Sequence, residues 1–120
     1  MNEIQFNATF RAAKLGAEVN KSANCTLTMA GTQMVQQTQS IPTTGWTSVS
    51  FGNLAGVPAK VMLINNDPTN YLQLAGDNAG AELQDKLQPG GDFVIRSPLA
   101  AIYAQSHTAA CTLLVVAVDA

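Results

Sequence analysis

The chain has 120 residues, a formal net charge of −2 and 47% hydrophobic residues, which is typical of one domain with a substantial core. Only 12% of its residues are charged, about half the usual share for a globular domain. The sequence contains no Lys/Arg cluster, which argues against nucleic-acid binding through phosphates. It also begins without a signal-peptide pattern, and its longest apolar stretch, residues 111–118, is far shorter than the roughly 20 residues that cross a bilayer.

The N-terminal half shows apolar and polar residues in alternation, which predicts half-buried strands. Clear alternation covers residues 4–11 and 23–30, and the segment between them, 14–22, is interpreted as a connection. The Gln-rich segment 33–40 has few apolar residues, which favours an edge strand or an extended arm. A further alternating strand is expected from Thr47 to Phe51.

The C-terminal half opens with a strand, 61–64, whose residues are apolar on both faces. Such a strand is covered on both sides, either within a sandwich or at a subunit contact. Asn65 to Pro68 form a strong turn signal, because Asn and Asp bond their own backbone and Pro fixes φ. Segment 81–87 suits one or two helical turns capped by Asp77 or Asn78. Further strands are expected at 71–75, 92–96, 100–105 and 110–118.

These elements amount to about eight or nine short strands at roughly 8–12-residue spacing, which is typical of a sandwich or barrel. No alternation of strands with helices is present, and no linker divides the chain. We therefore predict an all-β, single-domain antiparallel β-sandwich over residues 1–120, with a jelly-roll-like topology as the first choice.

Catalytic chemistry has little support in the sequence. His107 is the only histidine, and its neighbour Ser106 would point to the opposite face of a strand. No metal-ligand spacing links His107 to the cysteines. The remaining acids are interpreted as solvated loop carboxylates: Asp67, Asp77, Glu82, Asp85 and Asp92. We therefore expect no catalytic site, no metal, no cofactor and no enzymatic activity.

The two cysteines, Cys25 and Cys111, each fall in a strand-like segment. We expect two buried free thiols in a reducing compartment. A disulfide between them would require adjacent strands, which the sequence leaves open.

Five residues are candidates for contact with a partner. Trp46, which precedes a strand, either stacks on a sugar or a subunit, or packs onto the end of the sandwich. Tyr71 and Tyr103 lie on strands, where partner contact and core packing are both open. Met62 and Ile64 belong to the strand with two apolar faces.

The stretches VMLINNDPTNYLQLAG (61–76) and LQPGGDFVIR (87–96), followed by a Tyr-containing strand and a final apolar strand, resemble small β-sandwich virion proteins of tailed bacteriophages. The likeness extends best over residues 58–118, and Gly91 stands where an acid often follows Pro-Gly in that family. The resemblance implies a structural role in a virion, with synthesis in the host cytoplasm.

Three functions are compatible with these observations. The first is a capsid decoration, or cement, protein bound in many copies to the major capsid protein or other virion proteins, and forming a homo-oligomer within the particle. Polar segments at 14–22 and 31–45 would then reach over neighbouring subunits. The second is a tail, neck or tail-tip component. The third is a carbohydrate-binding jelly roll that uses Trp46 and the tyrosines. A surface with few ions suits dense assembly, because burying an unpaired ion is costly.

Overall fold

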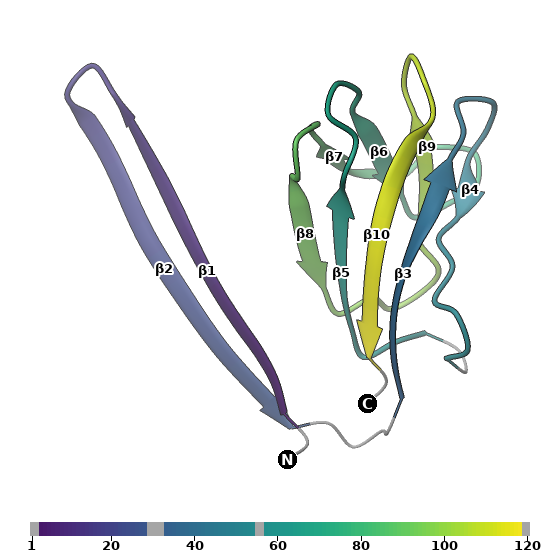
Figure 1. The fold of residues 1–120 in the computed structure, drawn as a ribbon, viewed down its shortest axis with the longest axis horizontal. Helices are drawn as coiled ribbons and strands as arrows, with labels where there is room; N and C mark the ends of the chain where they lie inside the picture. Colours follow the sequence, from purple (N-terminus) through teal and green to yellow (C-terminus); the bar gives the residue numbers. More distant parts are fainter. Residues whose placement is uncertain (1–2, 29–32, 55–56, 119–120) are drawn as a thin grey trace. The chain divides into compact units, whose positions relative to one another are not determined.

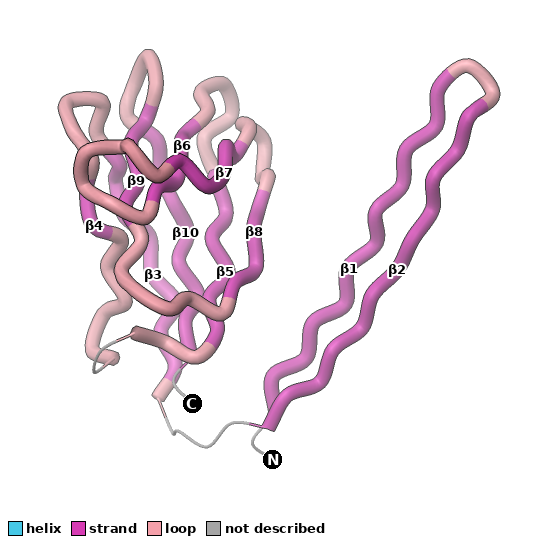
Figure 2. Tube along the Cα trace, turned by 180° about the vertical axis from the view of Figure 1, so that it is seen from behind, coloured by secondary structure: helices cyan, strands magenta, loops and turns pink. Residues whose placement is uncertain are grey.

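The computed structural model describes residues 3–28, 33–54 and 57–118, and these residues form β-strands joined by turns and loops (Figures 1 and 2). The chain divides into two compact units, Met1–Ala30 and Gly31–Ala120, where the sequence predicted one domain. The first unit is a β-hairpin and the second is an antiparallel β-sandwich.

The first unit pairs two long strands, β1 (Glu3–Lys14) and β2 (Ala17–Thr28), in an unbroken antiparallel register from Glu3↔Thr28 to Lys14↔Ala17. The connection is the two-residue turn Leu15-Gly16, and both residues have positive φ, 51° and 84°. That geometry matches the twist of the flanking strands, so it allows the tightest hairpin.

This hairpin corrects the interpretation of 14–22 as a connection, because residues 17–22 are part of β2. The turn escaped sequence reasoning because Leu15 occupies a position that normally calls for Asn, Asp or Gly. A leucine at positive φ is an unusual, strained choice. It is tolerated here at a tip where its side chain is 97% exposed.

The predicted all-β sandwich is confirmed, and it lies in the second unit, where the described residues form eight strands with a jelly-roll topology. The sequence had placed about eight or nine strands in one sandwich over residues 1–120. One sheet, the front sheet, has the order β3-β10-β5-β8, and the other, the back sheet, has the order β4-β9-β6-β7 (Figures 1 and 2). The front sheet contains β3 (Met34–Ile41), β5 (Lys60–Asn65), β8 (Phe93–Arg96) and β10 (Cys111–Val118). The back sheet contains β4 (Thr47–Ser48), β6 (Leu72–Ala75), β7 (Leu83–Leu87) and β9 (Tyr103–Ser106).

The pairing of these strands is nested, which is what defines the topology. The first strand of the unit pairs with the last (β3 with β10), and the second pairs with the second-last (β4 with β9). The two inner pairs are β5 with β8 and β6 with β7. All of these pairs are antiparallel. The chain therefore behaves as one long hairpin whose four strand pairs are rolled alternately into two sheets.

The core lies between the two sheets and is built from alternate residues of each strand. Leu63 and Leu113 of the front sheet and Leu72 and Leu74 of the back sheet are completely buried. Period-two alternation produces this arrangement, because successive side chains on a strand point to opposite faces. The described part of the chain leaves no buried side-chain nitrogen or oxygen without a hydrogen bond.

The buried amide of Asn65 joins the two sheets at one end of the sandwich. Its Nδ2 donates to the backbone oxygens of Asn70 (2.9 Å), Leu87 (3.1 Å) and Gln88 (3.2 Å), while its Oδ1 accepts from the backbone N–H of Asp67 (3.0 Å). Asn65 belongs to β5 of the front sheet and Leu87 to β7 of the back sheet. One side chain therefore organises both polar turns that follow these strands.

Two other expectations have clear outcomes. The Gln-rich strand, β3, lies at the edge of the front sheet, which confirms the edge-strand alternative and shows that its residues are not a free arm. The helical turns expected over 81–87 are wrong, because Leu83–Leu87 form β7. Pairing with β6 overrides the local preference, and Asp77 instead accepts hydrogen bonds from the backbone N–H groups of Ala81 and Glu82.

We predict that Asn65→Ala lowers the free energy of unfolding by about 2–4 kcal/mol, because it leaves three buried or partly buried carbonyls without their amide donor. The matched control is Asn66→Ala at the adjacent exposed position, which should cost less than about 0.5 kcal/mol. Urea unfolding of both variants measures the difference. Equal stabilities for the two variants would show that the Asn65 network does not hold the loops.

The stability of the turn after β5 should depend on pH. Hydrogen bonds from the backbone N–H groups of Thr69 and Asn70 to Asp67 Oδ1 hold the pKa of this carboxyl below its usual value of 3.8. The stabilisation is therefore complete above that pH and is lost as pH falls through the lowered pKa. We expect amide exchange at Thr69 and Asn70, measured by NMR, to lose protection below pH 3.8, and Asp67→Asn to weaken that dependence.

Candidate assembly surface

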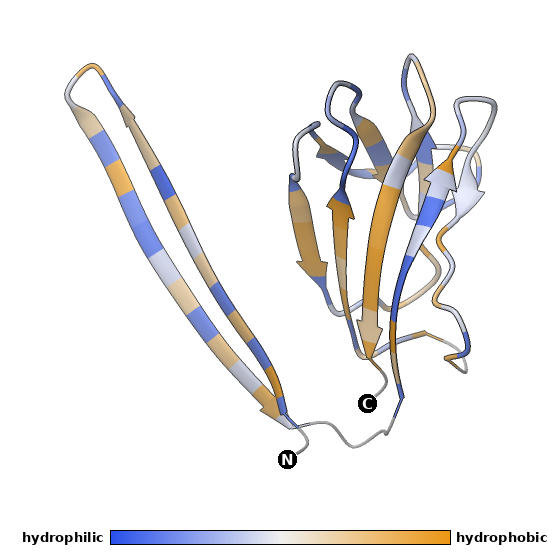
Figure 3. Ribbon diagram, in the orientation of Figure 1, coloured by the Kyte–Doolittle hydropathy of each residue, from blue (hydrophilic) through white to orange (hydrophobic). Residues whose placement is uncertain are grey.

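The outer face of the front sheet is apolar across three of its strands. Leu114, Ile64 and Phe93 lie side by side in register, and a second row consists of Val116, Met62 and Ile95. Figure 3 shows β5, β8 and β10 as hydrophobic along most of their length. We call this patch of six residues the outer apolar face. It lies opposite the core, since Val61, Leu63 and Val115 point inward.

The outer apolar face is accessible on the described chain. Phe93 is 50% exposed, and the other five residues are half-buried. The back sheet differs, because its outer face presents Gln105, Gln73 and Lys86 in one row. A contiguous exposed apolar patch of this kind marks a candidate site for contact with another protein.

The hairpin has the same two-sided character. One face holds the pairs Ile4–Leu27, Phe6–Cys25, Ala8–Ala23, Phe10–Lys21 and Ala12–Val19. The opposite face is polar, and there the hydroxyls of Thr9 and Ser22 bond across the strands at 3.1 Å. Phe10 is 66% exposed and Val19 is 49% exposed. We call the first face the hairpin apolar face.

The predicted contact residues separate into two groups. Met62 and Ile64 lie at the centre of the outer apolar face. Tyr103 lies on the outer side of the back sheet, opposite Ser48 and Ala75. Tyr71 stacks on His107, with 4.7 Å between ring centroids, and the Lys86 ammonium lies 4.0 Å from the Tyr71 ring centroid. The structure therefore brings together only Met62 and Ile64.

Trp46 is half-buried and packs against the backbone of Gly80. A Cβ built on Gly80 would lie 2.4 Å from Trp46 Nε1, so the indole fills the space that only a glycine leaves. Gly80 also has a positive φ of 72°. This contact favours the alternative in which Trp46 packs onto the sandwich, and the indole face against Gly80 is closed to a ligand.

The two cysteines have different environments. Cys111 is buried, as expected, and its thiol lies 3.4 Å from the carbonyl oxygen of Asn70. Cys25 is exposed on the hairpin apolar face, so the expectation of a second buried thiol is wrong for this residue. Both thiols are free. The alternating pattern around Cys25 correctly indicated an apolar face, but a two-stranded ribbon has no second layer to cover it.

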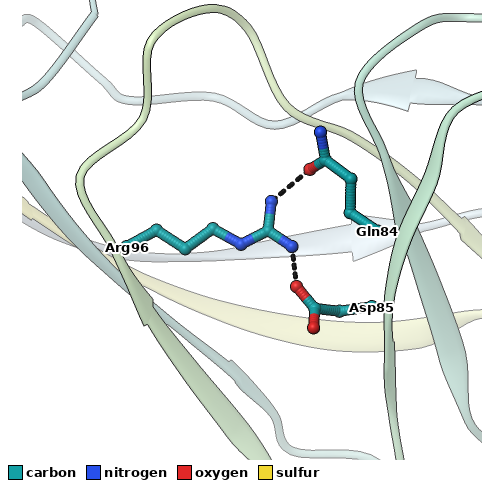
Figure 4. A network of polar contacts seen from close by, with 3 residues as sticks. All are labelled: Gln84, Asp85 and Arg96. Atoms are coloured by element: carbon teal, nitrogen blue, oxygen red, sulfur yellow. Dashed lines mark hydrogen bonds and ion pairs between the residues drawn. The ribbon is translucent and has the colours of Figure 1, made fainter.

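Arg96 closes one open side of the sandwich (Figure 4). Its guanidinium forms an ion pair with the Asp85 carboxylate and donates a hydrogen bond to the side-chain oxygen of Gln84. Arg96 belongs to β8 and its partners to β7, the edge strands of the two sheets. Partial burial lowers the pKa of Arg96. The ion pair is thus an inter-sheet tie.

A groove of about 510 Å³ lies beside this tie. It is lined by Glu82, Gln84, Arg96 and the loop 97–102. The side chains of Gln84 and Arg96 are hydrogen-bonded to each other, so we assign them a structural role in this groove. Leu99 in this loop is 99% exposed.

The residues weighed as catalytic candidates do not converge. Ser106 is buried and its hydroxyl donates to the carbonyl of Ile41, whereas His107 is exposed. Across the described residues, no three His, Cys, Asp or Glu side chains are grouped closely enough to hold a metal ion. The same part of the chain contains no helix with the length and apolarity needed to cross a membrane.

Comparison with models of known protein families, with curated proteins and with solved structures found no match to this chain. The two apolar surfaces are therefore interpreted from their own chemistry.

Adjacent residues on β5 should respond differently to the same truncation. Leu63→Ala removes a fully buried core side chain and should cost about 2–5 kcal/mol. Ile64→Ala acts on the half-buried outer apolar face and should cost about 1 kcal/mol, because less apolar area is lost. Urea unfolding at a concentration where the chain is monomeric checks both values. A cost for Ile64→Ala as large as that for Leu63→Ala would show that this face is internal.

Proposed function

We propose that the chain is a non-enzymatic structural protein of a tailed-phage virion, and specifically a capsid decoration, or cement, protein. In this proposal many copies bind to the shell of major capsid protein and to one another, and they stabilise the particle. The observation that carries the proposal is the pair of apolar surfaces, on the front sheet and on the hairpin, which the described chain leaves accessible.

The low charge of the chain, 12% of its residues, reduces the cost of covering these surfaces. Covering an apolar face that has few ions avoids the desolvation penalty of several kcal/mol per unpaired ion. Burial of apolar area then supplies the driving force. Binding to the assembled shell but not to its dissociated state would raise shell stability by mass action. Such a protein requires extended surfaces rather than a pocket with convergent polar groups.

The resemblance to small phage virion proteins adds support of a different kind. Its residues, from Asn65 through Asn70 and from Leu87 through Asp92, form the loop network around the Asn65 amide. Gly90 N–H donates to the carbonyl of Asp67, and Gly91 N–H to that of Asn65. The motif therefore indicates a shared way of building the sandwich, and the function itself depends on the exposed faces.

The alternatives keep different amounts of support. A tail, neck or tail-tip component would use the same surfaces, so it differs only in the location within the particle. A carbohydrate-binding jelly roll is less well supported, because one face of Trp46 is closed by Gly80 and the ring of Tyr71 is engaged by His107 and Lys86. Jelly rolls serve many functions, so the fold alone does not choose among them.

The test uses particles of the phage that encodes the chain, prepared with and without its gene. We expect shells lacking the protein to dissociate at a lower temperature, measured by release of packaged DNA, and purified protein to restore the higher temperature. Phe93→Asp should restore less, because it places a charge on the outer apolar face. Leu83→Asp changes another exposed apolar residue, on the back sheet, and should restore fully.

Two results would contradict the cement role. If shells without the protein dissociate at the same temperature as shells with it, the protein does not stabilise the shell. Intact shells that lack tails or fail to join them would move the function to the tail or neck.

A further inference from the structure

The hairpin and the front sheet each have an apolar face that no other strand of the same unit covers. A single two-stranded hairpin is at best marginally stable in water, so a ribbon of this length needs another layer on its apolar side. From Thr9 to Thr28, every residue of the two strands is exposed on the described chain. The outer apolar face of the front sheet also lacks a third layer, because the back sheet covers only its inner side.

We propose that the hairpin apolar face of one molecule covers the outer apolar face of a second copy of this chain. This inference deepens the proposed function, because it names the neighbour that links decorating copies to one another. In a two-fold dimer the exchange is reciprocal, and in a ring each copy gives one hairpin and receives one.

The two surfaces match in form. Both are strand faces on which every second residue is apolar, and such faces pack on one another at about 10 Å with their strands nearly aligned. On the hairpin apolar face Phe10 lies between Ala8 and Ala12 along its strand, and Val19 lies opposite Ala12. Alternating large and small side chains allow the facing layer to interdigitate.

The area also favours exchange between copies. Twelve residues at about 3.4 Å per residue, two strands wide, give each hairpin face about 400 Å². The longest strands of the front sheet have eight residues, so an aligned hairpin overlaps this sheet over roughly 27 Å, which is about 260 Å². In a reciprocal dimer each copy gives one hairpin and receives one, so each buries about 520 Å², and the total of about 1,000 Å² is at the lower limit for a specific interface. Two hairpins packed face to face would bury about 400 Å² per copy.

Charge complementarity points the same way. The first unit carries three basic residues against two acidic ones, whereas residues 31–120 carry three against six. Lys21 lies beside Phe10 on the hairpin apolar face. Asp92 precedes Phe93 at one end of the outer apolar face, and Lys60, at the other end of β5, donates to the Ser97 hydroxyl. Packing two hairpin apolar faces together would instead bring like charges close to each other, because Lys21 of each copy lies on that face.

The experiment uses full-length chains and sedimentation equilibrium. Wild-type protein should form a dimer or ring. Phe10→Asp on the hairpin and Phe93→Asp on the sheet should each raise the dissociation constant at least about 100-fold, since each places an unpaired carboxylate in an apolar contact. The controls Thr9→Asp, on the polar face of the same strand, and Leu83→Asp, on the back sheet, should associate like wild type. Circular dichroism confirms that each variant is folded.

Mixing the two variants provides the decisive result. The Phe93→Asp copy has an intact hairpin and the Phe10→Asp copy has an intact sheet, so their mixture should form a 1:1 complex that neither forms alone. Association of the Phe93→Asp variant by itself would show that hairpins pair with hairpins and would overturn the inference. A monomeric wild type would also overturn it. Neither result depends on particles, so this test and the shell test can fail separately.

Discussion

The structure depends on one constraint: a two-layer sandwich buries only one face of each sheet, while strands β5, β8 and β10 are apolar on both. The inner residues, such as Leu63 and Leu113, form the core. The outer residues, such as Met62 and Ile64, alternate with them and must therefore point away from it. The same residues that make these strands strong sheet formers thus create a surface that favours contact with another protein layer.

The polar residues between the strands serve the fold. Asn65 of the front sheet donates its amide to the carbonyl of Leu87 in the back sheet and to those of the loop residues Asn70 and Gln88. The turn that follows Asn65 is held by Asp67. A buried amide with all of its bonds satisfied is favourable, whereas a partly satisfied one would be costly. This explains why the most distinctive segment of the sequence contributes architecture, while the candidate contacts lie on plain aliphatic and aromatic residues beside it.

The hairpin extends the same logic to a unit that has no core of its own. Its alternation would be ordinary in a sandwich strand, yet here it yields a ribbon with one polar and one apolar face. Low overall charge reduces the cost of covering that face. In the proposed decoration role, neighbours held close by the shell would supply the layer that this ribbon lacks.

The sequence by itself determined the fold class and the two apolar faces around Met62 and Ile64, and it left the Gln-rich segment as either an edge strand or an extended arm. These inferences follow from the order of apolar and polar residues along each strand, which is a local property of the chain. Only the tertiary structure decided that 81–87 pairs as a strand, that Leu15-Gly16 closes a hairpin, and that Cys25 is exposed while Cys111 is buried. Each of these depends on which segment lies alongside another, and alternation specifies that a face is apolar without specifying what covers it.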